Sequence, residues 1–299
     1  MAGILLMLMA ISAPARSAPV QVPFDFSRSE IGVEVMIKGT PLYVLIDTGV
    51  DPSVIDRSRA EALGLEIDKG DGGEASGFGE GKGQAVFPAK IAGLTIQGRG
   101  YGPIDALASD LSALSTHYGR KLDAVLGYSF LSDKIVMIDY PRRNLAILDD
   151  AAEAAAMTGS CRTRWSTGFE TVDGFPILQD FRFGTLAGPI SIDTGANGGI
   201  GLYQQALDLP GLRDALVEKG AIVHNGARGS SKASAYAIAV PVGFGPFRLP
   251  AGQVASLHPI RGSAGGPIAN IGNPLFAAMK VRMLLDYRAR TMTFYGDCR

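Results

Sequence analysis

Two short segments of this 299-residue chain end in the same four residues, Ile-Asp-Thr-Gly. The first contains Asp47 and the second contains Asp193, and each follows a short apolar run that is typical of a strand. One copy alone would indicate only a turn, because Asp and Gly both favour turns. If two copies meet in the fold, their carboxyl groups share one proton. Such a pair can hold a water molecule, with one carboxylate as base and the other carboxyl as acid.

The two motifs belong to a longer internal repeat. Leu126-Gly127 in the first half matches Ile271-Gly272 in the second, and each half then has an apolar run that ends in Asp-Tyr, at Asp139 and Asp286. Three matched blocks in the same order, at nearly the same offset, indicate two copies of one unit of about 140 residues, which is a normal domain size. We therefore predict one lobe over residues 19–155 and a second over residues 156–299, joined near an Ala-rich, acidic stretch.

Each unit is predicted to consist mostly of strands. A short helix is expected over residues 58–65, where it is stopped by Gly, and another over residues 203–207. Six glycines between residues 71 and 84 predict a hairpin or a flexible loop, and residues 224–234 occupy the corresponding place in the second unit. Gly127 is expected to open a further short helix.

At the level of these motifs, the sequence resembles the pepsin-like and retropepsin-like aspartic proteases. The resemblance rests on the two Ile-Asp-Thr-Gly segments and on the later pairs Leu126-Gly127 and Ile271-Gly272. It implies a mainly β, two-lobed aspartic-protease β-barrel fold with pseudo-two-fold symmetry, built from two retropepsin-like units in one chain. It also implies an aspartic-type endopeptidase that hydrolyses peptide bonds of a polypeptide substrate without a cofactor.

The resemblance assigns roles to individual residues. Asp47 and Asp193 would be the catalytic pair, and the residues that follow them would support it: Thr48, Gly49, Thr194 and Gly195. The glycine-rich segment would be a flap over the substrate, with Gly77, Phe78 and Gly79 at its centre and Tyr236 on a second flap. Family members commonly have a small residue and then Ser or Thr shortly after the motif glycine, whereas here Gly49 is followed by Val50-Asp51-Pro52-Ser53 and Gly195 by Ala196-Asn197-Gly198-Gly199. Asp51 adds an acid that we expect to face solvent.

Composition excludes several other classes of function. The formal net charge is −1, so there is no basic excess to bind nucleic acid. The three histidines are far apart and lack the spacing of metal ligands, and the glycine-rich segment fits neither a phosphate loop nor a dinucleotide site. We therefore expect no metal and no nucleic-acid partner.

The N-terminus and the cysteines bear on the compartment. An apolar run over residues 1–11, followed by small residues, predicts a signal peptide over residues 1–18 and an exported, periplasmic or secreted protein without stable membrane insertion. Export would allow a disulfide between Cys161 and Cys298 that closes off the second half, with two free thiols as the alternative. Because each half supplies one carboxyl group, we expect the chain to act as a monomer.

Two other functions remain open from the sequence. The unusual residues after the motif glycines are also compatible with a non-catalytic peptide-binding protein on the same fold. A two-carboxylate glycosidase is the third hypothesis, although that function would not explain why Thr-Gly recurs beside both acids.

Overall fold

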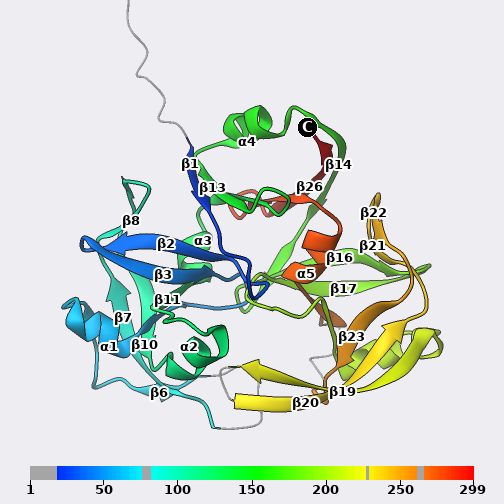
Figure 1. The fold of residues 1–299 in the computed structure, drawn as a ribbon, viewed down its shortest axis with the longest axis horizontal. Helices are drawn as coiled ribbons and strands as arrows, with labels where there is room; N and C mark the ends of the chain where they lie inside the picture. Colours follow the sequence, from blue (N-terminus) through cyan, green and yellow to red (C-terminus); the bar gives the residue numbers. More distant parts are fainter. Residues whose placement is uncertain (1–18, 76–81, 227–228, 261–265) are drawn as a thin grey trace, which may run out of the picture.

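The computed structural model describes residues 19–75, 82–226, 229–260 and 266–299. The predicted signal peptide, residues 1–18, lies outside these ranges. Within them the molecule is mainly β, as predicted. A sheet of six strands spans the top of the view in Figure 1, and one larger sheet descends on each side. No helix in the described ranges is both long enough and apolar enough to cross a membrane.

The six-stranded sheet combines strands from both halves of the chain. Its central pair is antiparallel, with Asp139 opposite Arg282, and each repeat contributes its own strands on either side of that pair. The order across the sheet is β1 (Val20–Pro23), β13 (Asn144–Leu148), β12 (Ile135–Asp139), β25 (Arg282–Asp286), β26 (Thr291–Cys298) and β14 (Cys161–Gly168). The matched Asp-Tyr runs of the repeat thus form the two strands that meet at the pseudo-two-fold axis.

The first large sheet is built from the N-terminal half. In this sheet β11 runs parallel to β3, and Leu126 lies opposite Ile46. The order is β5 (Glu66–Ile67), β7 (Ala85–Ile91), β10 (Ile104–Ser109), β4 (Ser53–Asp56), β11 (Ala124–Leu126), β3 (Thr40–Ile46), β2 (Gly32–Ile37), β8 (Leu94–Ile96) and β9 (Arg99–Gly100), with β6 (Gly73–Glu74) on β7.

The second large sheet repeats this pattern in the C-terminal half. Here β24 runs parallel to β17, and Gly272 lies opposite Asp193. The order is β19 (Leu216–Gly226), β20 (Gly229–Ile238), β23 (Gln253–Leu257), β18 (Ile200–Leu202), β24 (Ala269–Gly272), β17 (Leu186–Asp193), β16 (Phe175–Phe183), β21 (Val242–Phe244) and β22 (Phe247–Leu249), with β15 (Glu170–Val172) on β16.

Short helices occupy the connections. They are α1 (Arg57–Ala62), α2 (Ser112–Tyr118), α3 (Tyr128–Leu131), α4 (Ala151–Thr158) and α5 (Asn273–Ala278), together with the 3₁₀ turns η1 (Gln204–Asp208) and η2 (Arg213–Ala215). Asp56 caps α1 by accepting a hydrogen bond from the backbone N–H of Arg59, and Gly64 adopts a positive φ just after the helix. The expected helix near residues 58–65 therefore forms, whereas the segment near 203–207 is a 3₁₀ turn.

One continuous hydrophobic core joins the two halves. It contains Phe130 from α3 and Phe276 from α5, which are 1% and 0% exposed. Phe276 also packs on Phe294 of the six-stranded sheet, with ring centroids 6.0 Å apart. Burial of one such ring contributes roughly 1.5–3 kcal/mol, so this packing fixes how the two halves meet.

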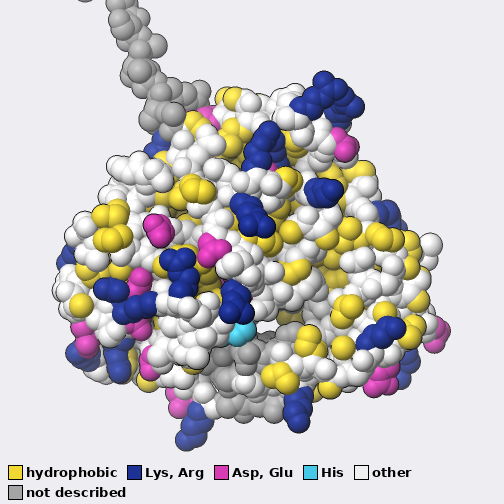
Figure 2. Space-filling model, viewed as in Figure 1, with side chains coloured by type: hydrophobic (Ala, Val, Ile, Leu, Met, Phe, Trp, Pro, Cys, Tyr) yellow, Lys and Arg dark blue, Asp and Glu magenta, His cyan; other side chains and the backbone are white. Residues whose placement is uncertain are grey.

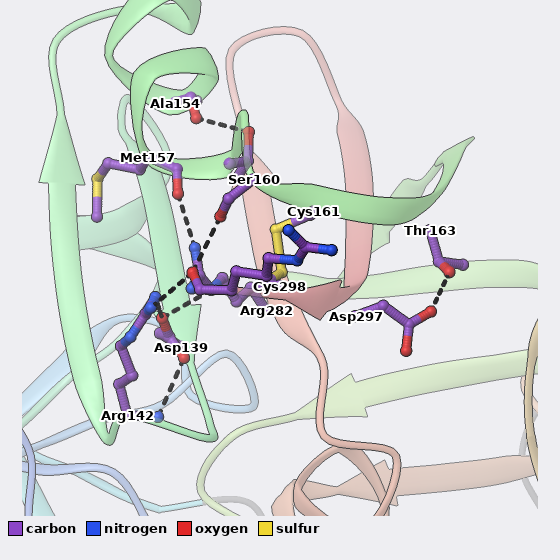
Figure 3. The surroundings of a disulfide bond; sticks show 12 residues. Asp139, Arg142, Ala154, Met157, Ser160, Cys161, Thr163, Arg282, Asp297 and Cys298 are labelled. Carbon is purple, nitrogen blue, oxygen red and sulfur yellow. Dashed lines mark hydrogen bonds and ion pairs between the residues drawn. A yellow bond between two sulfur atoms is a disulfide. The ribbon is translucent and has the colours of Figure 1, made fainter.

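A disulfide and an ion pair link strands of the six-stranded sheet (Figure 3). Cys161 of β14 and Cys298 of β26 lie opposite each other and form a disulfide, which joins the start of the second half to its end. At the central pair of strands, Asp139 Oδ2 lies 2.8 Å from Arg282 Nε, and both side chains are less than a tenth exposed. Asp139 also accepts a hydrogen bond from the backbone N–H of Arg142.

Candidate active site

Asp47 and Asp193 stand at equivalent places, directly after β3 and at the end of β17. In each loop the backbone N–H two residues later donates to the Asp carboxyl: Gly49 N to Asp47 Oδ1 at 2.7 Å, and Gly195 N to Asp193 Oδ1 at 2.9 Å. These bonds give each carboxyl group the same orientation relative to its own loop. The two Asp-Thr-Gly segments are therefore structural copies as well as sequence copies.

Reciprocal hydrogen bonds between the two threonines join the loops. Thr48 Oγ1 donates to the carbonyl of Ile192 at 2.8 Å, and Thr194 Oγ1 donates to the carbonyl of Ile46 at 2.8 Å. Each hydroxyl also accepts from the backbone N–H of the opposite threonine at 3.0 Å. The two threonines are 2% and 0% exposed, so these four bonds are sheltered from water. They bind the halves together directly beneath the two carboxyl groups.

The glycines of the motifs allow this close approach. A Cβ atom at Gly49 would lie 2.6 Å from Asp193 Oδ1, and a Cβ atom at Gly195 would collide with Asp47 Oδ2. A second pair of glycines passes under the loops: a Cβ at Gly127 would strike the carbonyl of Val50, and one at Gly272 would strike the carbonyl of Gly198. The apolar-Gly pairs that the repeat singled out thus lie where no side chain fits.

The two carboxyl groups interact directly. Burial raises the pKa of Asp47 well above its ordinary value, and the neighbouring charge of Asp193 and a hydrogen bond between the two side chains raise it further. The N–H groups of Gly49 and Gly195 oppose this shift. A pair of acids this close titrates as a unit, and it retains one proton over a range in which isolated carboxyl groups would be ionised.

A string of polar side chains reaches Asp193 from the second half. Asn270 Nδ2 donates to Asp193 Oδ2 at 2.8 Å, and Ser191 Oγ donates to Asn270 Oδ1 at 2.7 Å. Tyr203 is in turn hydrogen-bonded to Ser191. We did not predict these three residues from the sequence. The available signal was that Asn270 breaks the repeat, because Val125 occupies the same place in the first half.

A further polar cluster flanks the second loop. Glu30 is 4% exposed, and its carboxyl group is hydrogen-bonded to Asn197, two residues beyond Gly195. Asn197 also contacts His117 of α2, with Nδ2 and Nε2 3.1 Å apart. Burial raises the pKa of Glu30 to about 7. No sequence motif links the members of this cluster, because they come from three separate segments.

The predicted flap residues have different outcomes. Gly77, Phe78 and Gly79 lie outside the described residues, although the flanking backbone pairs as a hairpin between β6 and β7. Tyr236 lies on the longer hairpin formed by β19 and β20 and packs, half-buried, against the main core. Both hairpins lie at the bottom of Figure 1, on the opposite side of the molecule from the six-stranded sheet. Asp51 is exposed, as expected.

The surface near the hairpins shows no dominant charge. In Figure 2 the lower part of this face carries scattered Lys, Arg, Asp and Glu side chains among apolar ones, beside atoms drawn in grey. Among the described residues, no group of three or more His, Cys, Asp or Glu side chains is arranged to hold a metal ion.

Comparison with known proteins agrees with this geometry. Residues 33–130 match the family model described as aspartyl protease, which covers the segment from β2 to α3 and includes Asp47, Thr48 and Gly49. No curated protein matches the sequence. The matched family, the curled half-barrel sheets and their pseudo-symmetric arrangement confirm the predicted fold class. Residues 33–130 are thus similar to the aspartyl protease family, and the described chain has an aspartic-protease β-barrel fold.

Proposed function

We propose that this protein is an aspartic endopeptidase that hydrolyses peptide bonds with a water molecule activated by Asp47 and Asp193. The observation that supports it most is the reciprocal bonding of Thr48 and Thr194, which holds the two Asp-Thr-Gly loops face to face. A merely structural pair of turns would not require two acids to share a proton in a buried position, at a cost in desolvation.

The chemistry follows from the shared proton. The ionised carboxylate takes a proton from the water as its oxygen attacks the peptide carbonyl carbon, while the protonated carboxyl gives its proton to the carbonyl oxygen. The resulting gem-diol intermediate collapses when the carboxyl group that took the water proton gives it to the amide nitrogen, a gem-diol hydroxyl returns a proton to the other carboxylate, and the C–N bond breaks. The pair ends with one proton, as it began, so neither a covalent intermediate nor a cofactor is needed.

The two hairpins suggest how a polypeptide would bind. We propose that the β6–β7 and β19–β20 hairpins close over an extended peptide and bond to its backbone, with Gly77, Phe78, Gly79 and Tyr236 as the contacts to test. In this proposal residues 19–155 and 156–299 are the two lobes. The chain acts as a monomer, because it contains both carboxyl groups.

We also propose that the protein is exported to the periplasm or secreted. Residues 1–18 have the composition of a signal peptide. The Cys161–Cys298 disulfide is consistent with an oxidising compartment.

Cleavage of a fluorogenic peptide library across pH 3–8 tests the proposed activity. The wild-type protein should cleave with a bell-shaped pH profile, and Asp47→Asn and Asp193→Asn should each lose activity while retaining the fold. Family members commonly have a small residue and then Ser or Thr shortly after the motif glycine, whereas this chain has Val50-Asp51-Pro52-Ser53 and Ala196-Asn197-Gly198-Gly199. This departure favours a peptide-binding protein as the second candidate. Tight peptide binding without cleavage at any pH would replace the first proposal with the second.

A further inference from the structure

We propose that Asn270 is a positioning residue that makes Asp193 the ionised member of the carboxyl pair and leaves the shared proton on Asp47. The inference deepens the proposed function, and it rests on that function for its consequence in catalysis. Its structural basis is an amide donor that the second half supplies to one carboxyl group and the first half does not supply to the other.

The amide of Asn270 is oriented from both ends. Its Nδ2 donates to Asp193 Oδ2 at 2.8 Å, while its Oδ1 accepts from Ser191 Oγ at 2.7 Å. Burial raises the pKa of Tyr203, so this phenol stays protonated and its O–H is free to donate to Ser191. With each hydroxyl donating to the next group, the N–H of Asn270 is directed at the carboxylate.

Asp193 thus has a fixed donor on each oxygen, one of them a side-chain amide, whereas the donors to Asp47 are the backbone N–H groups of Gly49 and Gly195. The backbone N–H of Gly195 donates to Oδ1 and the side chain of Asn270 donates to Oδ2. Hydrogen bonds to an ionised acceptor are roughly twice as strong as those to a neutral one, so the donors favour charge on this carboxyl group.

The first half serves as an internal comparison. The positions of Asn270 and Ser191 in paired strands β24 and β17 correspond to Val125 and Leu45 in paired strands β11 and β3. Val125 and Leu45 pack in an apolar cluster with Leu111 and Leu122 and provide no donor. The pseudo-two-fold symmetry of the backbone is therefore broken by side chains at one matched pair of positions, on the side of Asp193.

Other charges near the pair do not produce this asymmetry. The titratable neighbours are Tyr118, Tyr203 and Tyr287, and burial raises the pKa of each of these phenols, so they are neutral at the pH of interest. Glu30 interacts electrostatically with Tyr118. Its pKa is about 7, so its charge affects the alkaline side of the titration of the carboxyl pair. The high pKa of Asp47 agrees with the proton being on that residue.

Asn270→Val tests the inference, because it places the first-half residue at the second-half position. The titration of the carboxyl pair is followed by ¹³C NMR of labelled Asp, and in parallel by the pH profile of kcat/KM. A charge-assisted hydrogen bond corresponds to about one pKa unit or more, so the lower apparent pKa of the pair should rise by about one unit. The upper apparent pKa should move by less than about 0.3 unit, since Asp193 is ionised before and after that step.

Two further variants make the test specific. Ser191→Ala should raise the lower apparent pKa less than Asn270→Val does, and it substitutes for that variant if the latter fails to fold. Val125→Ala, which disturbs packing at the matched position without removing a donor, should leave the lower apparent pKa unchanged. Folded Asn270→Val or Ser191→Ala protein that titrates like the wild type would overturn the inference.

The NMR titration also separates this inference from the proposed function. If the wild-type protein cleaves no peptide, the proposed activity fails, yet the carboxyl titration still decides the role of Asn270. If peptide is cleaved and the lower apparent pKa does not respond to Asn270→Val, only the inference fails.

Discussion

Thr194→Val should separate the two halves of the candidate site while preserving side-chain shape. The substitution replaces a hydroxyl with a methyl group at a residue that is 0% exposed. It removes the donor to the carbonyl of Ile46 and the acceptor for the backbone N–H of Thr48. Both lost partners belong to the opposite half of the chain, so the damage is to the junction between the loops.

The magnitude follows from which groups lose a partner. The N–H of Thr48 is buried and would be left unpaired, which costs about 1–3 kcal/mol, and loss of the bond to the Ile46 carbonyl costs about 1 kcal/mol more. The free energy of unfolding should therefore fall by about 2–4 kcal/mol. Thr194→Ser is the matched control, because it keeps the hydroxyl and removes one methyl group, worth about 1 kcal/mol.

Urea denaturation followed by circular dichroism measures the loss of stability. The fluorescence of Trp165, the only tryptophan, gives a second probe of the same transition. Peptide cleavage should fall at least about 100-fold in Thr194→Val and stay within about tenfold of the wild type in Thr194→Ser, because misplacement by about 1 Å costs about 100-fold. Equal stability and equal cleavage in the two variants would refute the view that the hydroxyl holds the loops together.

Two other substitutions test the surroundings of the pair. Burial raises the pKa of Glu30 to about 7 from an ordinary value of 4.5, so the folded protein keeps a proton that the unfolded chain loses between these pH values. The free energy of unfolding therefore falls as pH rises from about 4.5 to 7. Glu30→Gln should be more stable than the wild type by up to about 3 kcal/mol at pH 8, but not at pH 4. A difference in urea midpoints that is the same at both pH values would contradict this. Gly195→Ala places a methyl group against Asp47 Oδ2, and the carboxyl group must move aside. Cleavage should drop at least about 100-fold while the melting temperature changes little, whereas Gly199→Ala, where a Cβ meets only ordinary contacts, should retain activity.

Repetition made the overall fold predictable from the sequence. The matched Ile-Asp-Thr-Gly segments and the apolar-Gly pairs lie on adjacent parallel strands in both halves, with Ile46 beside Leu126 and Ile192 beside Ile271. The repeated Asp-Tyr runs form β12 and β25, which pair at the axis. A repeat of this kind reports on elements that both copies share, and these shared elements are the ones that position Asp47 and Asp193.

What the sequence could not predict lies where the copies differ or where distant segments meet. Glu30, Asn197 and His117 come from three separate segments, and no local pattern links them before the chain folds. The ion pair of Asp139 with Arg282 depends on the register of β12 against β25. The matched alignment did contain the substitution of Val125 by Asn270, but its importance depends on a distance to Asp193 that only the structure gives.

Two differences between the copies concern the Asp-Thr-Gly loop of the second half. Where the first half has Val125 and Tyr128, the second has Asn270 and Asn273, and each asparagine bonds to the Asp-Thr-Gly loop. Asn273 donates to the carbonyl of Thr194 at 2.6 Å and accepts from the hydroxyl of Tyr140, which belongs to the first half.

A symmetric pair of carboxyl groups would have no preferred site for its single proton, whereas an acid and a base must differ at the moment water attacks. The shared bonds of the threonines bring the two acids together, and the asparagines of the second copy give them different surroundings. Duplication thus supplies the geometry of the site, and divergence after duplication supplies the difference between its two acids.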